Sequence, residues 1–457
     1  MMESMAVKAR LFGTDGVRGV AGEYPLDRDT VFRMGGALGR VLRKEAAVRP
    51  LRIVLGEDTR ASSGWISRLL AAGLRSRGVE VAYAGVITTP GIAFLARGEK
   101  FAGGAMVSAS HNPFQDNGIK LLSNSGMKLP ESLEIEIESL LDSISSTEAS
   151  HDLPLEVTPQ LLIDYEDFLE STASHSGDFI HRLVVDCANG SATRVAPALL
   201  ARLGIDALFF HASPDGRNIN LECGSLHPEK MAGETRTSGA DLGVAFDGDA
   251  DRAIFATRDG RILDGDYVLY AMASHLQQQG RLKGGAVVGT LMTNLGLELA
   301  LAARGIGLKR TPVGDKYVLE EMLRSGSNLG GEPSGHIIFS DVSLAGDGLI
   351  TLLQVLQLVE DTGKSLGELV SPLKQFPQII RNVRVSERRP LDSIPEVGLA
   401  VSEFRSEVGD RGRVVVRYSG TEPLARVMVE AEEADLVERH AARIAGAIDS
   451  VVGLRSA

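Results

Sequence analysis

Residues 51–85, LRIVLGEDTRASSGWISRLLAAGLRSRGVEVAYAG, have the pattern of a strand, a polar loop, a helix and a second strand. Leu51–Leu55 is a short apolar run of the kind that forms a buried strand, and VEVAYAG at the end is another. Between them, apolar side chains recur at helical spacing, at Ile66, Leu69, Leu70 and Leu74. Gly78 then ends the predicted helix. The stretch predicts a β-α-β unit whose polar loop follows the first strand, where ligands usually bind in such sheets.

Two later stretches repeat this rhythm without repeating the sequence, RLVVDCANGSAT (182–193) and AVVGTLMTNLG (286–296). Near the C-terminus, the strand-like runs RVVVRYS (413–419) and ARVMVEAE (425–432) precede a helix with an apolar face made by Val437, Ala441, Ile444 and Ile448. The chain is therefore predicted to be an α/β protein with three related α/β domains and a smaller C-terminal α+β domain. The expected domains are residues 1–152, 153–257, 258–372 and 373–457. The first boundary falls in a linker-like segment (143–156) that follows an acidic, solvated helix at 131–140.

The composition excludes several classes of protein. The chain has 457 residues, 44% hydrophobic and 24% charged, which is typical of a globular protein with several domains. It has no long apolar run and no secretory signal, so we expect a cytoplasmic protein without a membrane span. A net charge of −12 argues against binding to nucleic acid. The two cysteines, Cys187 and Cys223, cannot form a disulfide framework or a zinc site alone, and we expect them to be reduced and buried.

The segment AMVSASHNPFQDNGIK (105–120) gathers two serines, a histidine and several amides directly after a strand-like run. Pro113 keeps the chain from continuing as strand or helix, so Ser110 is expected at a corner that displays its hydroxyl. Such a serine becomes a nucleophile when a base or cationic neighbours activate it. An ordinary Ser/Asn/Pro turn is the alternative, and Ser108 is a rival nucleophile.

The segment DGDADR (247–252) places carboxylates at alternate positions, with small residues between them. Asp247, Asp249 and Asp251 can converge on Mg²⁺, which prefers oxygen ligands and leaves positions for water or a phosphate. Without a cation they would repel and raise one another's pKa values. An acidic surface turn is the alternative. The apolar run 242–246 favours the metal site, because it delivers the loop from a buried strand.

Two further loops carry groups suited to a phosphosugar. In GGEPSGH (330–336), Glu332 and Ser334 point the same way on an extended segment and suit the vicinal hydroxyls of a sugar. A glycine-rich turn is the alternative for this loop. Lys316, in VGDKYV (313–318), adds a cation upstream. In RYSGTEP (417–423), a guanidinium, two hydroxyls and exposed backbone N–H groups are suited to a phosphate.

Six motifs occur in a fixed order along the chain: LFGTDGVRG (11–19), SASHNP (108–113), NGIK (117–120), DGDADR, GGEPSGH and SGTEP (419–423). On these motifs the chain resembles the α-D-phosphohexomutase superfamily over essentially its whole length, and within it the bacterial phosphoglucosamine mutases. The resemblance implies four domains around a central cleft that holds the active site. It also implies an isomerase that interconverts glucosamine 6-phosphate and glucosamine 1-phosphate for cell-wall precursor synthesis.

The resemblance further implies a role for each motif. Ser110 carries a phosphoryl group, hands it to the sugar phosphate, and takes the opposite phosphate back from a hexosamine 1,6-bisphosphate. One Mg²⁺ is expected on Asp247, Asp249, Asp251 and the phosphorylated Ser110. Catalytic cations and proton-transfer groups are expected at Arg18, His111, Lys120 and Arg252. Substrate contacts are expected at Lys316, Glu332, Ser334, His336, Arg417, Ser419, Gly420, Thr421 and Arg426.

Two positions depart from the pattern of the glucosamine-specific group. Pro333 stands where Gln is usual, and Tyr418 stands where Pro is usual. Pro333 fixes its own φ and removes a donor beside Glu332, so it bears on the choice of sugar. The alternatives are a phosphomannomutase/phosphoglucomutase, a phosphatase or bisphosphate synthase, and a non-catalytic phosphosugar-binding protein. The sequence leaves open whether the chain forms a homodimer.

Overall fold

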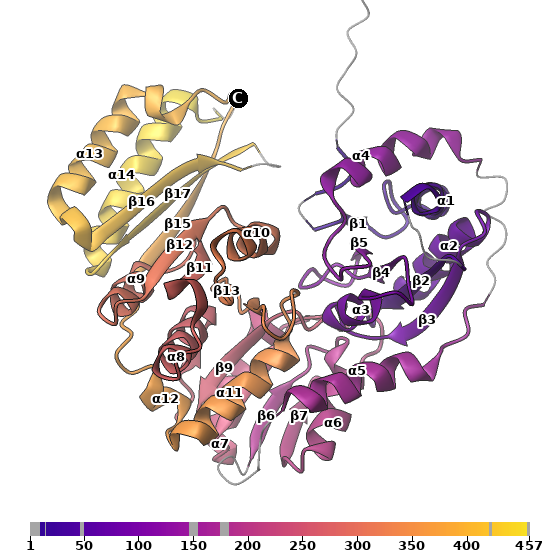
Figure 1. Ribbon diagram of the computed structural model, residues 1–457. Coiled ribbons are helices and arrows are strands. Elements are labelled where there is room, and N and C mark those ends of the chain that lie inside the picture. The colour runs from indigo at the N-terminus through magenta and orange to yellow at the C-terminus, as the bar shows by residue number, and fades with distance from the viewer. Residues whose placement is uncertain are drawn as a thin grey trace, which may run out of the picture.

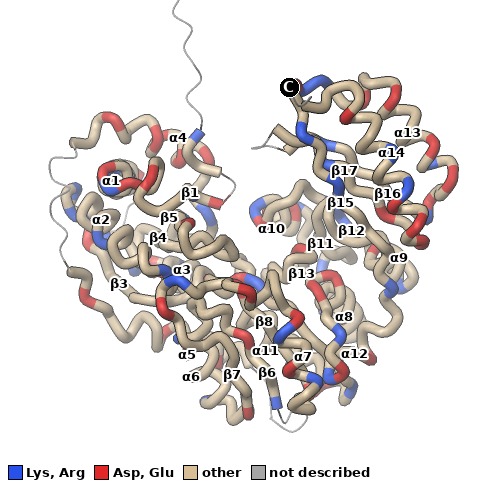
Figure 2. The backbone as a smooth tube through the Cα atoms, turned by 180° about the vertical axis from the view of Figure 1, so that it is seen from behind, with Lys and Arg blue, Asp and Glu red and all other residues tan. Residues whose placement is uncertain are grey.

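The chain folds into four successive β-sheets, each with its own helices (Figure 1). The structure is a computed structural model that describes residues 10–13, 15–45, 50–145, 154–173, 182–419 and 423–454. In Figures 1 and 2 the sheets follow one another around an arc, so that the first and the fourth stand at its two ends. The predicted α/β architecture is confirmed.

The first sheet contains the predicted β-α-β unit as β2 (Arg52–Glu57), α2 (Ser63–Arg75) and β3 (Glu80–Val86). Its strand order is β1-β5-β4-β2-β3, and β2 pairs in parallel with both β3 and β4. Gly78, two residues before β3, adopts a φ of +73°, a conformation that glycine reaches without strain. The remaining elements are β1 (Val17–Val20), α1 (Arg28–Glu45), α3 (Thr89–Ala96), β4 (Gly103–Val107), β5 (Asp116–Ser123) and α4 (Glu131–Leu140).

The predicted acidic helix is α4, whose glutamates appear as red segments of the backbone tube in Figure 2 and whose only buried residue is Ile137. A helix, α5 (Pro159–Thr172), leads into the second sheet, which has the order β10-β9-β8-β6-β7. Its elements are β6 (Leu183–Asp186), α6 (Ala192–Arg202), β7 (Ala207–Phe210), α7 (Glu229–Ser238), β8 (Leu242–Phe246), β9 (Ala253–Thr257) and β10 (Ile262–Leu263).

The third sheet has the order β12-β11-β13-β14. Its elements are α8 (Gly265–Gln278), β11 (Ala286–Thr290), α9 (Leu295–Ala302), β12 (Gly307–Thr311), α10 (Asp315–Ser325), β13 (Leu329–Gly331), β14 (Ile337–Phe339), α11 (Gly348–Thr362) and α12 (Leu366–Leu369). The fourth sheet is antiparallel, in the order β15-β17-β16. Its elements are β15 (Gln378–Arg384), α13 (Pro395–Val408), β16 (Gly412–Tyr418), β17 (Leu424–Ala431) and α14 (Ala434–Val452).

The first three sheets share one topology. In each, the strand next to one edge pairs in parallel with the next two strands of the chain, and the third strand then pairs antiparallel with a fourth. These strands next to an edge are β2, β6 and β11. The chain thus returns through one short turn at the corresponding place in each sheet, between β4 and β5, β8 and β9, and β13 and β14.

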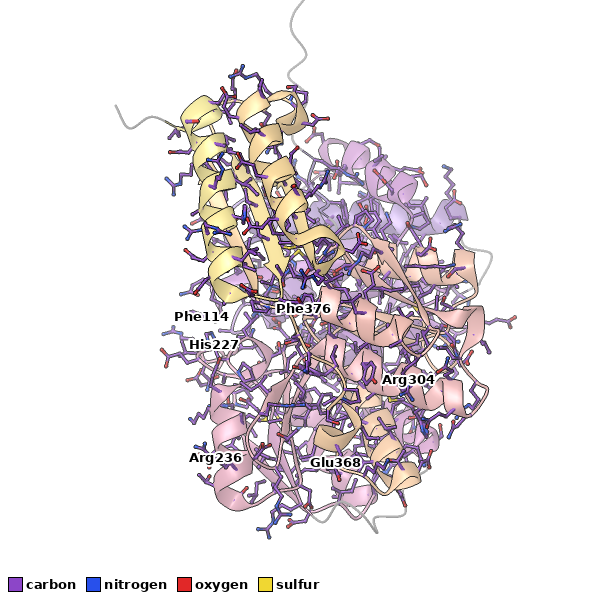
Figure 3. All side chains as sticks on the ribbon, turned by 90° about the vertical axis from the view of Figure 1, so that its left-hand side faces the viewer. Phe114, His227, Arg236, Arg304, Glu368 and Phe376 are labelled. Carbon is purple, nitrogen blue, oxygen red and sulfur yellow. The ribbon has the colours of Figure 1, made fainter. Side chains whose placement is uncertain are left out.

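The hydrophobic cores pack the first three sheets together and leave the fourth sheet with a core of its own. One continuous core joins the first three sheets through residues such as Val54, Val185 and Val287. The fourth sheet has a separate core, which includes the predicted helix face with Val437 and Ile448. Its junction with the third sheet is polar: the side chain of Asn294 exchanges two hydrogen bonds with the backbone of Phe376, which is labelled at this junction in Figure 3.

Two predictions about the whole chain can be compared with these elements. Cys187 and Cys223 are both buried and free, as expected. Within the described ranges, every helix is too short or too polar to span a bilayer.

Strand β10 belongs to the second sheet although it lies beyond residue 257, where the second domain was expected to end. The expected boundary at residues 152–153 lies outside the described residues, and the exact bounds of the four domains stay a prediction.

Candidate active site

Three of the polar loops singled out from the sequence occupy corresponding turns of the first three sheets. Residues 108–115 connect β4 to β5, residues 247–252 connect β8 to β9, and residues 332–336 connect β13 to β14. Each turn follows the carboxyl end of a parallel strand, the edge at which ligands bind in α/β folds. The arrangement brings Ser110 within 2.6 Å of Asp247, although 137 positions separate them in the chain.

Ser110 sits in the turn after β4 with a φ of +52°, a region that costs energy for a residue with a side chain. Its hydroxyl donates to Oδ2 of Asp247 at 2.6 Å and lies 3.2 Å from Nδ1 of His111. Its backbone N–H donates to Oγ of Ser108, which is fully buried. Ser108 therefore supports the turn, and Ser110 is the serine that faces the carboxylates.

Two residues that the sequence analysis missed hold the carbonyl of Ser110. Nη2 of Arg60 donates to it at 3.0 Å, and Nδ2 of Asn220 donates to it at 2.9 Å. The same two groups also donate to the carbonyl of Asn112. Arg60 lies in the loop GEDTRASSG after β2, where its side chain is buried beside Asp58. The position of this polar loop after a strand was a signal that it could contact a ligand. Nothing in the sequence indicated that Asn220 would contact Ser110.

The carboxylates of Asp247, Asp249 and Asp251 form one cluster, with an oxygen of each within 4.8 Å of the others. Burial, with the two neighbouring carboxylates, raises the pKa of Asp247 well above its ordinary value. Oδ1 of Asp249 and Oδ1 of Asp251 are buried and accept no hydrogen bond from any residue that the structure describes. A buried set of oxygen donors with free lone pairs fits Mg²⁺, which would offset the charge that burial disfavours.

Lys120 supplies positive charge beside this cluster. Its Nζ lies 2.8 Å from Oδ2 of Asp249 and 3.1 Å from Oδ2 of Asp15, and its side chain is only 4% exposed. Burial alone would lower the pKa of Lys120, but Asp15, Asp249 and Asp251 outweigh burial and raise it. Lys120 therefore carries a positive charge beside these carboxylates.

Asp15, which the sequence analysis did not single out, also binds Lys128 at 2.7 Å. Nζ of Lys128 lies 2.7 Å from Oδ1 of Asp315 at the start of α10, so this pair of ion pairs joins the first sheet to the third. Asp15 belongs to the motif LFGTDGVRG, which was recognised as a whole but not resolved into roles.

His111, in contrast to Lys120, lies where burial and neighbouring positive charges lower its pKa. Burial, together with the charges of Arg252 and Arg18, lowers its pKa to about 4, so its imidazole is neutral at pH 7. Arg18, on β1, donates to the carbonyl of Ala109 and to Oδ1 of Asn112, both at 3.2 Å. Nε of Arg252 lies 3.8 Å from Oδ1 of Asp251. The four predicted catalytic residues beside Ser110 thus lie around the two turns, three of them as cations.

The turn between β13 and β14 differs in conformation from the prediction. Glu332 and Ser334 were expected on an extended segment, which is wrong. The alternative, a glycine-rich turn, forms instead: the N–H of Gly335 donates to the carbonyl of Glu332 and closes a tight turn. Pro333 occupies the second position of this turn, where its fixed φ is favourable. Oγ of Ser334 is buried without a hydrogen bond to any described residue.

His336 closes this turn and faces the carboxylate cluster, with Nδ1 3.6 Å from Oδ2 of Asp251. Burial would lower the pKa of His336, but Asp251, Asp315 and Glu332 outweigh burial and raise it to about 9. The predicted substrate residue Lys316 lines the same cavity of about 280 Å³ as His336, Lys120 and Asp251. Lys120, Lys316 and His336 bring positive charge to this cavity at the junction of the first three sheets, and Asp15, Asp251 and Asp315 line it as well.

The fourth sheet carries the predicted phosphate loop at the turn between β16 and β17. Arg417 and Arg426 lie on the two strands as register partners, and Ser419 is buried at the end of β16. Gly420 and Thr421 lie outside the described residues. The hydroxyl of Tyr418 donates to the carbonyl of Arg389 within the same domain. In Figure 1 the β16–β17 hairpin stands at the opposite end of the arc from β1 and α4.

Comparisons with known protein families cover most of the chain. Residues 9–148, 164–260 and 264–376 match the phosphoglucomutase/phosphomannomutase alpha/beta/alpha domains I, II and III in that order. Residues 381–447 match the phosphoglucomutase/phosphomannomutase C-terminal domain.

Similar proteins of known sequence share the whole length of the chain. A protein of Koribacter versatilis (strain Ellin345) named phosphoglucosamine mutase is 48% identical, over 97% of this chain and 98% of its own. One of Solibacter usitatus (strain Ellin6076) with the same name is also 48% identical, over 97% and 99%.

Among solved structures, a putative phosphomannomutase from Thermus thermophilus matches with a TM-score of 0.77 and 25% identity, over 96% of this chain and 98% of its own. A phosphoglucomutase/phosphomannomutase family protein from Burkholderia thailandensis matches with a TM-score of 0.78 and 22% identity, over 96% and 97%, and shows the same fold.

Proposed function

Because this chain belongs to the phosphoglucomutase/phosphomannomutase family, we propose that it is an isomerase that interconverts glucosamine 6-phosphate and glucosamine 1-phosphate. The observation that carries the proposal is the meeting of Ser110, in a strained turn, with the carboxylate of Asp247 at 2.6 Å. A serine held beside a buried cluster of metal-binding carboxylates is suited to carry a phosphoryl group.

In the proposed reaction, phosphorylated Ser110 transfers its phosphoryl group to the free hydroxyl of the bound sugar phosphate. The bond between Oγ and phosphorus breaks as the bond from the sugar oxygen forms, which gives a hexosamine 1,6-bisphosphate. The bisphosphate turns over in the site, and its opposite phosphoryl group returns to Oγ of Ser110. Catalysis is then mainly positioning and neutralisation of charge.

We assign Asp247, Asp249 and Asp251, with phosphorylated Ser110, as the residues that hold one Mg²⁺. The ion supplies charge neutralisation for the transferring phosphoryl group when it is bound. Positive charge around the transferring phosphoryl group comes from Arg18, Lys120 and Arg252. The backbone of Ser110 is held from two different domains, by Arg60 and Asn220.

The proton of the attacking hydroxyl needs an acceptor, and His111 is suited to this role. Its imidazole is neutral at pH 7 and lies 3.2 Å from Oγ of Ser110, whereas Lys120 is held in its charged form. His111 takes the proton from the sugar hydroxyl and passes it to Oγ of Ser110 as the phosphoryl group leaves.

We assign substrate recognition to the third and fourth domains. Glu332, Ser334, His336 and Lys316 bind the sugar and its nearby phosphate, and the hydroxyl of Ser334, which has no partner among the described residues, is available for a sugar hydroxyl. Arg417, Ser419 and Arg426, with Gly420 and Thr421, bind the phosphate that does not react. Closure of the fourth domain would exclude water, which favours a mutase over a phosphatase.

The choice of amino sugar rests on the relatives, which are named phosphoglucosamine mutases at 42–48% identity. Pro333 is compatible with this assignment. It occupies a turn position that suits proline, and its carbonyl accepts the N–H of Gly265 at the start of α8.

Two measurements test the proposal. The first compares Ser110→Ala with Ser108→Ala: we expect Ser110→Ala to lose nearly all turnover and its phosphorylation while it still binds sugar phosphate. Ser108→Ala should remain phosphorylated but turn over more slowly. A Ser110→Ala protein with near-normal turnover would overturn the mechanism.

The second measures kcat/KM for glucosamine, mannose and glucose 6-phosphates with Mg²⁺, with and without trace hexose 1,6-bisphosphate. We expect a preference for the amino sugar of more than about tenfold, or ~1.4 kcal/mol. Preference for mannose or glucose would keep the mechanism and assign the chain to the phosphomannomutase/phosphoglucomutase group. Release of free phosphate without isomerisation would make it a phosphatase.

A further inference from the structure

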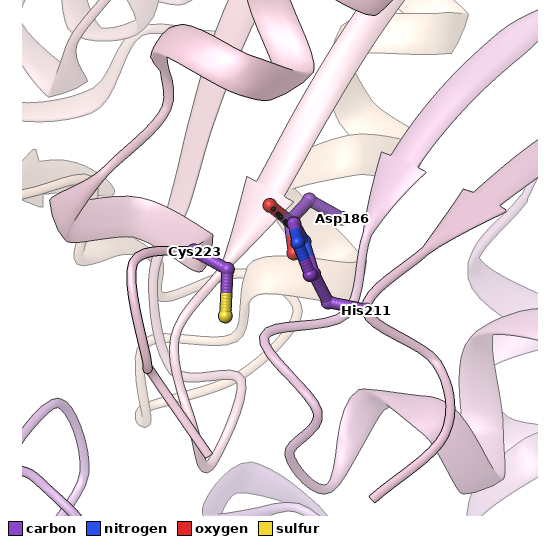
Figure 4. Close-up of side chains that lie close together, drawn as sticks. All are labelled: Asp186, His211 and Cys223. Atoms are coloured by element: carbon purple, nitrogen blue, oxygen red, sulfur yellow. Dashed lines mark ion pairs between the residues drawn. The ribbon is translucent and has the colours of Figure 1, made fainter. Parts of the chain in front are cut away.

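A second cluster of metal-binding side chains lies outside the active site, in the second domain (Figure 4). Asp186 ends β6, His211 directly follows β7, and Cys223 lies in the segment that leads to α7. Because β6 and β7 are parallel neighbours with Asp186 opposite Phe210, the first two side chains leave the carboxyl edge of the sheet side by side. One ligand atom of each of the three residues lies within 4.8 Å of the others.

The fold holds these three groups in place. Oδ1 of Asp186 accepts the N–H of Ala188 at 2.8 Å, and Oδ2 accepts the N–H of Gly224 at 3.0 Å. Each oxygen keeps a further lone pair. Nδ1 of His211 lies 3.0 Å from Oδ2 of Asp186, yet it is buried and has no hydrogen bond to any residue within the described ranges. Asp186 and Cys223 are both fully buried.

We propose that Asp186, His211 and Cys223 bind one divalent cation of the zinc class, at a site separate from the carboxylate cluster of the active site. A carboxylate oxygen, an imidazole nitrogen and a thiolate sulfur are ligands that Zn²⁺ and Co²⁺ accept together, whereas Mg²⁺ takes oxygen ligands. Three protein ligands leave a fourth tetrahedral position for water.

Binding of the cation removes the proton of the Cys223 thiol and fixes the position of the ring proton of His211. The cation replaces the proton of the Cys223 thiol, which leaves to solvent. It takes the lone pair of Nδ1 of His211, so the ring proton sits on Nε2. Nζ of Lys230 lies 3.3 Å from Nε2, and because Lys230 is exposed, its ammonium group can swing into water when Nε2 takes the proton.

The site has a structural consequence for the active-site turn. His211 and Cys223 stand near the two ends of the segment that carries Asn220, and Asn220 donates to the carbonyl of Ser110. A cation that ties both residues to Asp186 would brace this segment against β6. The inference concerns metal binding and does not depend on which sugar the chain acts on.

The experiment titrates the full-length protein with Co²⁺ while excess Mg²⁺ occupies the oxygen-rich site. A cobalt–thiolate bond gives a near-ultraviolet charge-transfer absorption that oxygen ligands cannot give. We expect this absorption to saturate at one Co²⁺ per chain and to disappear when Zn²⁺ is added. Cys223→Ser should abolish it, and the matched control Cys187→Ser should keep it, because Cys187 packs in the apolar core shared by the first three domains.

A second variant guards against misfolding of the cysteine variants. His211 has a φ of +45°, which asparagine tolerates better than most residues, so His211→Asn removes the imidazole with little backbone strain. We expect it to weaken Co²⁺ binding at least about tenfold. The proposal fails if the wild-type protein shows no thiolate absorption with Co²⁺. It fails equally if the absorption survives in Cys223→Ser or is lost in Cys187→Ser alone.

Discussion

Asn220→Gly tests whether catalysis depends on how the backbone of Ser110 is held. The side-chain amide of Asn220 donates to the carbonyls of Ser110 and Asn112 at 2.9 and 3.1 Å. Asn220 itself has a φ of +58°, which glycine adopts without strain. The substitution therefore removes two hydrogen bonds across the domain boundary and leaves the local backbone conformation accessible.

The size of the effect follows from these contacts. A neutral hydrogen bond contributes about 0.5–1.5 kcal/mol net. Arg60 still donates to both carbonyls, so neither acceptor is left without a partner and the loss stays at the lower end. A total of about 1–2 kcal/mol corresponds to roughly a 5- to 30-fold fall in rate. The loss should appear in kcat with little change in KM, because Asn220 positions Ser110 and is not assigned to the substrate.

Glu222→Gly is the matched control for this experiment. Glu222 lies in the same segment, has a φ of +50° and is exposed, so its replacement changes the backbone in the same way without touching the Ser110 turn. Both variants are compared by steady-state kinetics, by phosphoserine content from intact-protein mass, and by thermal unfolding. A kcat for Asn220→Gly within about twofold of that for Glu222→Gly would refute the reasoning.

Three further predictions concern metal, phosphate and pH. Asp249→Asn should raise the Mg²⁺ concentration for half-maximal rate at least about tenfold, and an unchanged Mg²⁺ titration would make the cluster structural. Arg417→Ala should raise KM for every sugar phosphate roughly 10- to 100-fold, as the loss of a charged hydrogen bond of about 1.5–3 kcal/mol predicts; an effect on one sugar only would contradict a phosphate contact. In Mg²⁺-free protein, His336 should hold its proton at pH 7 and lose it as pH rises through about 9, and Mg²⁺ should lower this value by neutralising Asp251. Histidine NMR titration, with His336→Gln for assignment, checks this, and a pKa at or below 6.5 would refute it.

The turns that carry chemistry could be predicted from the sequence because each is short and follows an apolar strand. The three aspartates were named from their own motif, whereas Ser108 remained a rival of Ser110 until the family resemblance selected Ser110. The structure brings Ser110 to Asp247. The β-α-β unit at 51–85 was predictable for the same reason: its strand and helix periodicities are local properties.

The contacts between these turns could not be predicted, because they depend on how three domains pack. Arg60 and Asn220 reach the same carbonyl from different domains, and no local pattern links their positions. Asp15 likewise forms ion pairs with Lys120 and Lys128 through tertiary packing. The turn at Glu332 was only the alternative interpretation for a different reason: alternation along a strand was applied to a segment where Pro333 and Gly335 favour a turn.

The repeated position of the turns in three consecutive domains has a consequence for synthesis of the chain. The ribosome releases the turn with Ser110 first, the carboxylate turn about one domain later, and the turn with His336 after that. Until the second domain has folded, the hydroxyl of Ser110 has neither Asp247 to accept its hydrogen bond nor Asn220 to hold its carbonyl. In the proposed mechanism, phosphoryl transfer at Ser110 therefore waits until the second domain, whose sheet ends at Leu263, has folded. A chain that terminates before that point lacks both of these partners of Ser110.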